Sequence, residues 1–189
     1  AETSFDLSAG YRKGSLNWNI AGNRQGSAPN VRSELKWSDL SIYQLSLSNR
    51  TTIKNRIYLR GHLDFGIVGS GSNRDSDYDG DDRTQEFSRS INGVDGNNVW
   101  DASAGIGPRL VFFNETIVMS PLLGYAISEQ DLNIVDGYQA ISQPPASTPV
   151  GPIAGLDSRY ETHWEGPWLG VDLMVLIPCS QGPFTRIGI

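Results

Sequence analysis

The chain has 189 residues, of which 38% are hydrophobic and 19% are charged, and it carries a formal net charge of −6. This length fits one domain, so we expect a single domain over residues 1–189. An acidic chain without a long Lys/Arg run is a poor partner for nucleic acid. The only cysteine, Cys179, excludes an internal disulfide framework. No run of about 18 apolar residues occurs, which excludes a transmembrane helix.

Most of the chain consists of segments in which apolar and polar residues alternate with the two-residue period of a β-strand. The first segment, residues 4–20, changes its apolar parity part-way along, which predicts a β-bulge near Gly14. Five more segments follow, at about residues 31–48, 56–70, 99–113, 116–134 and 158–177. The third is the clearest, since Ile57, Leu59, Leu63, Phe65 and Ile67 share one face. We therefore predict six long strands.

The length of these segments and of their connections suggests where the strands lie. Each segment has about 14–20 residues, against about 5–6 in strands of globular proteins. Connections after the second, fourth and sixth segments are short, whereas those at residues 21–30, 71–98 and 135–157 are long and polar. Short turns on one side and long loops on the other are typical of bacterial outer-membrane barrels. A soluble β-sandwich or a lipocalin-like barrel is the alternative.

We therefore expect an all-β fold, an antiparallel transmembrane β-barrel in the bacterial outer membrane. The strands form an up-and-down meander with long outer loops and short periplasmic turns. The apolar face of each strand meets lipid, and the polar face lines the lumen. Because barrels of this class have at least about eight strands, six strands are expected to form an incomplete barrel.

The acidic stretch NRDSDYDGDDRTQE, at residues 73–86, falls in the second long connection. Its carboxylates have the spacing of a calcium loop, D-x-D-x-D-G-x5-E, in which oxygen ligands suit a hard cation. The ligands would be Asp75, Asp77, Asp79 and Glu86. The flanking segments are not helical, so an EF-hand is excluded. A solvated acidic loop without a ligand and half of a protease active site are the alternatives; no cofactor is required, and calcium is the one cofactor that the sequence indicates.

A second polar group lies within the third strand segment. His62 and Asp64 fall on the face opposite the apolar residues, beside Arg60. We interpret this group as a hydrogen-bond and ion-pair network in the lumen, since a catalytic role would need a substrate near the middle of the barrel.

Several short motifs resemble the omptins, a family of outer-membrane barrel endopeptidases. These are SELKW at residues 33–37, IYLRGHLDFGIVGSGS at 57–72 and DSDY at 75–78. The stretches LLGYAISEQDLNIVDGY and SRYETHWEGPWLGVDL, at 122–138 and 158–173, resemble later strands of that family. The similarity covers about residues 31–175.

The resemblance implies a function and several site residues. Asp75 and Asp77 would be one catalytic pair, with Asp77 holding the attacking water, and the substrate would be a cationic peptide cut near basic residues. The second omptin pair, Asp-x-His, is not in this sequence. Tyr125 and His163 would contact lipopolysaccharide, next to the outer-membrane lipid. The alternative function is a non-catalytic structural or pore-forming barrel with an acidic outer loop.

Overall fold

The computed structural model describes residues 1–113, 116–177 and 185–188. These residues form one antiparallel sheet and a single-turn 3-10 helix, η1 (Asp81–Arg83). The strands are β1 (Glu2–Ile20), β2 (Ser33–Ile53), β3 (Ile57–Gly80), β4 (Thr84–Val94), β5 (Asn98–Pro108), β6 (Leu110–Phe112), β7 (Ile117–Ser142), β8 (Gly151–Ile177) and β9 (Thr185–Gly188). Within the described part of the chain, no helix is long and apolar enough to cross a membrane.

The strands follow one another as an up-and-down meander. Their order in the sheet is β1-β2-β3-β4-β7-β8-β9, and β5 lies between β3 and β7. The strands β4 and β5 succeed one another along the chain between β3 and β7, and β6 continues beside β7, so the three together act as one long, interrupted strand. All six predicted segments lie in strands, which confirms the all-β, antiparallel prediction.

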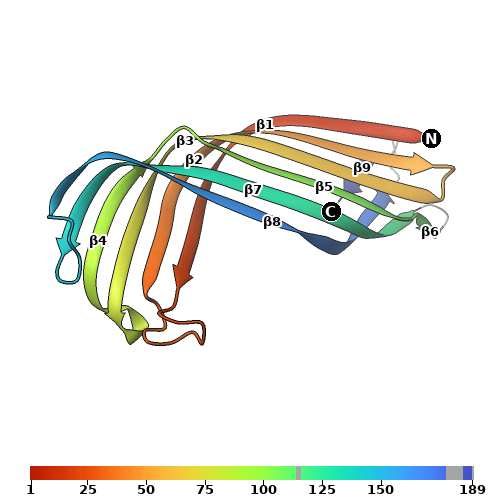
Figure 1. Ribbon diagram of the computed structural model, residues 1–189. Helices are drawn as coiled ribbons and strands as arrows, with labels where there is room; N and C mark the ends of the chain where they lie inside the picture. Colours follow the sequence, from red (N-terminus) through yellow and green to blue (C-terminus); the bar gives the residue numbers. More distant parts are fainter. Residues whose placement is uncertain (114–115, 178–184, 189) are drawn as a thin grey trace.

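The sheet bends sharply across its middle, so that it forms an arch with a convex and a concave face (Figure 1). On β1 and β2 the pairing register shifts between Gly14 and Leu16, which confirms the predicted bulge. The pairing of β2 with β3 shifts nearby, between Ser38 and Ser41 and again before Ile42. Bulges insert extra residues on one strand and bend it, so bulges at one level on neighbouring strands account for the bend.

The bend divides the sheet into two parts. The part that we call the barrel arm holds β5, β6, β9 and the segments 2–14, 41–53, 57–68, 117–130 and 162–177. The outer arm holds β4 and the segments 15–20, 33–40, 69–80, 131–142 and 151–161.

A belt of exposed apolar side chains covers the convex face of the barrel arm. Strand register places Leu7 opposite Leu47 and Leu47 opposite Leu63, so the belt runs without a break across β1, β2 and β3. Leu63 is 47% exposed and Leu169, on β8, is 83% exposed. The belt also includes Phe5, Tyr43, Leu45, Phe65, Ile67, Ile106, Leu123 and Val171. A continuous apolar surface of this kind meets lipid in outer-membrane barrels.

The outer arm has an apolar core of its own on the concave face. Trp37 is fully buried there with Leu132, and Val68, at the end of the barrel-arm part of β3, is fully buried in the same cluster. The Tyr160 ring, on β8, lies 4.5 Å from the Trp37 ring and 6.1 Å from that of Trp18 on β1. Because β1 and β8 are far apart in the strand order, these ring contacts show that the outer arm curls around its core.

Two of the three predicted long loops are wrong, because most of their residues form strands. Most of residues 71–98 belongs to β3, β4 and η1, and most of residues 135–157 belongs to β7 and β8. Their polar composition suggested loops, but Val94 and Leu156 lie among the polar residues and pack into the outer-arm core. The connection predicted at residues 21–30 is confirmed, because it lies between β1 and β2.

Candidate functional sites

Charged and hydroxyl side chains line the concave face of the barrel arm. Near the start of β3, the Tyr58 hydroxyl donates a 2.7 Å hydrogen bond to Asp172 on β8, and Arg60 donates a hydrogen bond of 2.8 Å to the same carboxylate. These three residues help to line a cavity of about 160 Å³, together with Arg50, Arg109 and Ser120 and with the apolar Val118, Leu173 and Met174. The strand period places Tyr58, Arg60 and Asp172 opposite the lipid-facing belt, because successive side chains alternate between faces.

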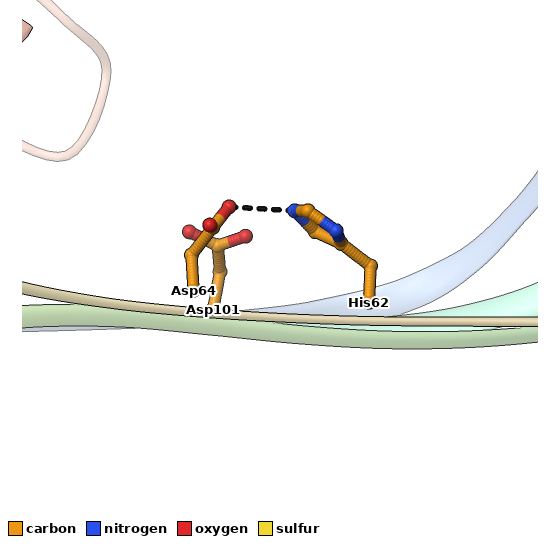
Figure 2. Close-up of side chains that lie close together, drawn as sticks. All are labelled: His62, Asp64 and Asp101. Atoms are coloured by element: carbon orange, nitrogen blue, oxygen red, sulfur yellow. Dashed lines mark hydrogen bonds and ion pairs between the residues drawn. The ribbon is translucent and has the colours of Figure 1, made fainter. Parts of the chain in front are cut away.

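One step farther along the same face lies a second cluster, of His62, Asp64 and Asp101 (Figure 2). His62 Nε2 is 2.6 Å from Asp64 Oδ2, and Gln44 donates a 2.8 Å hydrogen bond to Asp64 Oδ1. Asp101 on β5 is directly opposite Asp64 on β3. The hydrogen bond and ion pair of His62 with Asp64 agree with the polar network expected from the sequence, and Arg60 pairs with Asp172.

Asp75 and Asp77 lie in β3, not in a loop, and they face the concave side of the outer arm. Register places Asp75 between Leu35 of β2 and Ser90 of β4. Burial, together with the negative charge of Asp77, raises the pKa of Asp75 to about 6. Asp75 Oδ1 is buried, and no hydrogen-bond partner for it occurs among the described residues.

The other two predicted calcium ligands, Asp79 and Glu86, have partners of their own. Asp79 pairs with Arg32, and Glu86 accepts a 2.8 Å hydrogen bond from Nε of Arg89. In a strand, Asp75 and Asp79 stand roughly 13 Å apart along the chain, too far to share an ion. The calcium site at Asp75, Asp77, Asp79 and Glu86 stays an untested prediction, and this arrangement does not favour it.

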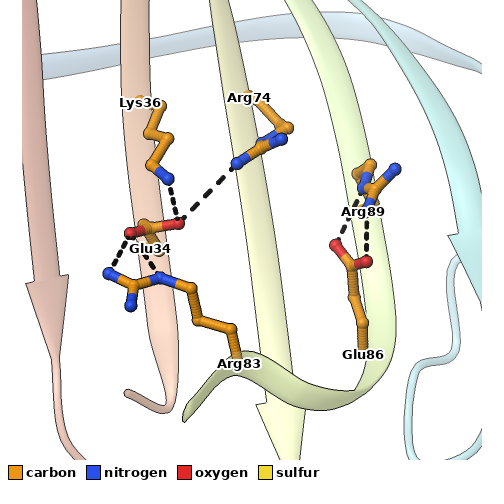
Figure 3. A network of polar contacts seen from close by, with 6 residues as sticks. All are labelled: Glu34, Lys36, Arg74, Arg83, Glu86 and Arg89. Atoms are coloured by element: carbon orange, nitrogen blue, oxygen red, sulfur yellow. Dashed lines mark hydrogen bonds and ion pairs between the residues drawn. The ribbon is translucent and has the colours of Figure 1, made fainter.

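A cation cluster that was not predicted from the sequence surrounds Glu34 on the convex face of the outer arm; Figure 3 shows its side chains. The Glu34 side chain is 2% exposed; it accepts hydrogen bonds from Arg83, the shorter of 2.7 Å, and lies 2.9 Å from Lys36 Nζ. Arg74 is 3.7 Å away. Burial alone would raise the pKa of Glu34, but the hydrogen bonds from Arg83 and Lys36 outweigh it and lower the pKa.

Glu34 and Lys36 lie two residues apart on one strand, so the sequence alone could have shown that they share a face. Arg74 and Arg83 come close to them only through the β2–β3 register and the η1 turn. Three cations around one carboxylate give this cluster more positive than negative charge.

The residues expected to contact lipopolysaccharide lie on the convex face. Tyr125 is 47% exposed within the apolar belt on β7. His163, on β8, is 2.9 Å from Glu129 and 3.7 Å from Glu165. Two carboxylates beside the imidazole do not favour an anionic phosphate at this position. Lipopolysaccharide contact at Tyr125 and His163 stays an untested prediction.

Comparison with known proteins corrects the family suggested by the sequence motifs. The family model that matches is Pom, described as Protochlamydia outer membrane protein, over residues 6–181. No curated protein matches the chain. The resemblance to the omptins is therefore wrong. Alternating strands, short turns and acidic segments follow from the demands of any outer-membrane barrel, so short motifs of this kind do not distinguish one barrel family from another.

The match agrees with the fold. Strands with a lipid-facing apolar belt and a polar concave face are those of an outer-membrane β-barrel, and the matched residues include most of β1 and all of β2 to β8. The chain is an antiparallel β-barrel protein of the bacterial outer membrane, and it belongs to the Pom family of outer membrane proteins.

Proposed function

We propose that this protein forms a water-filled pore, a porin-type channel through which small hydrophilic solutes diffuse across the outer membrane. The observation that carries the proposal is the segregation of the two faces of the barrel arm. The same strands carry an apolar belt on the convex face and charged side chains on the concave face. Water in a barrel lumen is the environment that solvates such side chains.

The exposure of the concave side chains supports a hydrated lumen. Arg60 keeps 46% of its side chain exposed although it pairs with Asp172. Arg50 is exposed and His62 is half-buried on the same face. A narrow barrel packs its interior with side chains, whereas wide barrels leave an aqueous channel. The outer arm bends toward the concave side (Figure 1), so we expect its apolar core to narrow the outer entrance.

An endopeptidase is not part of the proposal, because that activity depended on the omptin resemblance. Calcium binding is not part of it either, since Asp79 and Glu86 pair with arginines. A structural barrel that conducts nothing is the competing function, and the experiment below separates the two.

The test is the conductance of the purified, full-length protein in planar lipid bilayers. We expect stepwise increases in current, and we expect Arg60→Glu to shift the ion selectivity toward cations, because Arg60 lines the concave face. The matched control is Lys13→Glu, which makes the same change of charge at an exposed residue on the convex face, paired with Asp39. It should leave the selectivity unchanged. A bilayer current no greater than that without protein would contradict the pore and favour a structural role.

A further inference from the structure

We propose that His62, Asp64 and Asp101 form a binding site for a divalent transition metal such as zinc on the concave face of the barrel arm. This site goes beyond the proposed pore and does not depend on it, since metal binding is measured without any current.

The backbone brings the three side chains together. His62 and Asp64 are two residues apart on β3, so both project from the same face. Asp101 on β5 is directly opposite Asp64 in the register. One donor atom from each residue lies within 4.8 Å of the other two, and Figure 2 shows the three side chains rising from the sheet toward a common point. Ligands of one zinc ion lie about 2.0–2.2 Å from the metal, so metal binding would draw the three donor atoms closer together.

The two carboxylates of the cluster lie opposite each other without an ion pair to a lysine or arginine among the described residues. Like charges directly opposite each other on neighbouring strands destabilise a sheet. Asp64 and Asp101 are such a pair, and in the described part of the chain no lysine or arginine forms an ion pair with either. Among the described residues, the His62 imidazole contacts Asp64, and Arg12 acts on Asp101 through its charge without forming an ion pair with it. A metal ion between the carboxylates would remove the repulsion.

The donor set selects the kind of metal. One imidazole nitrogen and two carboxylate oxygens suit zinc and its neighbours among the divalent transition metals, whereas calcium prefers a larger set of oxygen ligands. Three protein ligands leave a coordination position open to water. Gln44 already donates a hydrogen bond of 2.8 Å to the Asp64 carboxylate, and a hydrogen bond of this kind orients a metal ligand. His62 keeps 34% of its side chain exposed, so the site is accessible to an ion from solution.

The experiment is calorimetric titration of zinc into the purified, full-length protein folded in detergent micelles. Cys179 and His163 are replaced first, by Cys179→Ser and His163→Gln, because either side chain could bind zinc elsewhere. We expect one zinc ion per chain. His62→Gln should weaken binding by more than about 100-fold, and Gln44→Ala by about 10–100-fold, the usual range for a residue that orients a ligand.

Asp101→Asn separates a loss of zinc binding from a loss of folding, because this variant should be more stable than the parent without metal. It removes one of two opposed carboxylates, so the metal-free protein should melt at a higher temperature than the parent. The same variant should lose the rise in melting temperature that zinc causes in the parent. Two results would overturn the proposal: no saturable zinc binding by the parent, or zinc binding that His62→Gln and Asp101→Asn leave unchanged. Equal affinity for calcium and zinc would overturn the selection by the donor set.

Discussion

At Asp75, burial and the neighbouring charge of Asp77 disfavour the ionised carboxylate, and its pKa rises to about 6. A carboxylic acid with a raised folded-state pKa binds its proton more tightly when folded than when unfolded. The free energy of unfolding therefore falls as the pH rises from the unfolded pKa, about 4, through the folded pKa, and it stays low above that. Asp75 in its ionised form thus destabilises the outer arm at neutral pH.

Asp75→Asn should raise the free energy of unfolding at pH 8 by about 1–2 kcal/mol, a value reduced from the full shift because the side chain is partly solvated. It should also remove part of the loss of stability between about pH 4 and pH 6. Urea unfolding in micelles at several pH values measures both effects.

Asp79→Asn is the matched control on the same strand. Asp79 pairs with Arg32, so its replacement should not stabilise the protein. A stability profile of Asp75→Asn that keeps the full pH dependence of the parent would show that another group titrates in this range.

At the scale of elements, the indole of Trp168 on β8 packs over β7 and β5 in the barrel arm. Trp168 lies over Gly105 and Gly124 on the concave face, where a β-carbon added to Gly124 would be 2.3 Å from Trp168 Cε2 and 2.4 Å from the Ala104 carbonyl oxygen. The two glycines provide the space that the ring fills, so their lack of a side chain is a packing requirement.

Gly124→Ala should therefore displace the indole and destabilise the barrel arm by about 1–3 kcal/mol, the usual cost of overpacking a filled site. Chemical denaturation followed by tryptophan fluorescence measures the change. Gly166→Ala is the control: a β-carbon there, in the same strand as Trp168, meets nothing within 4 Å. Equal losses in the two variants would contradict the packing role of Gly124 and point to a general cost of side chains in these strands.

At the scale of the whole molecule, the apolar belt decides how the barrel arm sits in the membrane. Leu63 lies in the middle of the belt, between Leu47 on β2 and Ala102 on β5. The adjacent His62 lies on the concave face, where Ser48 of β2 is its partner in the strand register. The orientation of the sheet in the bilayer follows from this difference between neighbouring residues.

Leu63→Arg should destabilise the protein folded in lipid bilayers by about 2–4 kcal/mol, the cost of an arginine near the bilayer midplane on a lipid-facing strand. Ser48→Arg places the same side chain on the concave face, where the cost should be much smaller. Reversible denaturation from vesicles gives both values. A larger loss for Ser48→Arg than for Leu63→Arg would mean that the concave face, and not the convex one, meets lipid.

The strand pattern was predictable because it is local. The alternation from Ile57 to Ile67 shows a strand and its two faces without any knowledge of its neighbours. The change of parity around Gly14 located a bulge in the same way. The strands within residues 71–98 and 135–157 were missed because they are polar: Asp75 and Asp77 belong to β3, but five aspartates in eight residues suggested a loop.

The contacts between distant residues were not predictable. Glu34 meets Arg83 from 49 residues farther along the chain, and Asp172 binds Arg60 from 112 residues away. Neither partner differs in type from many other charged residues of the chain. Their pairing follows from the register of the strands and from the turn at η1, which no local pattern encodes.

By itself, the sequence determined the all-β class, the long strands, the lipid-facing and lumen-facing sides, and with them the outer membrane. These properties depend on the two-residue period, which each segment carries alone. Only the tertiary structure decided that the sheet bends around an outer core, that Asp64 and Asp101 stand opposite each other, and that the acidic carboxylates are dispersed among separate partners. A shift of one residue in the pairing would move every side chain to the other face, and the correct register is selected by packing across the whole sheet.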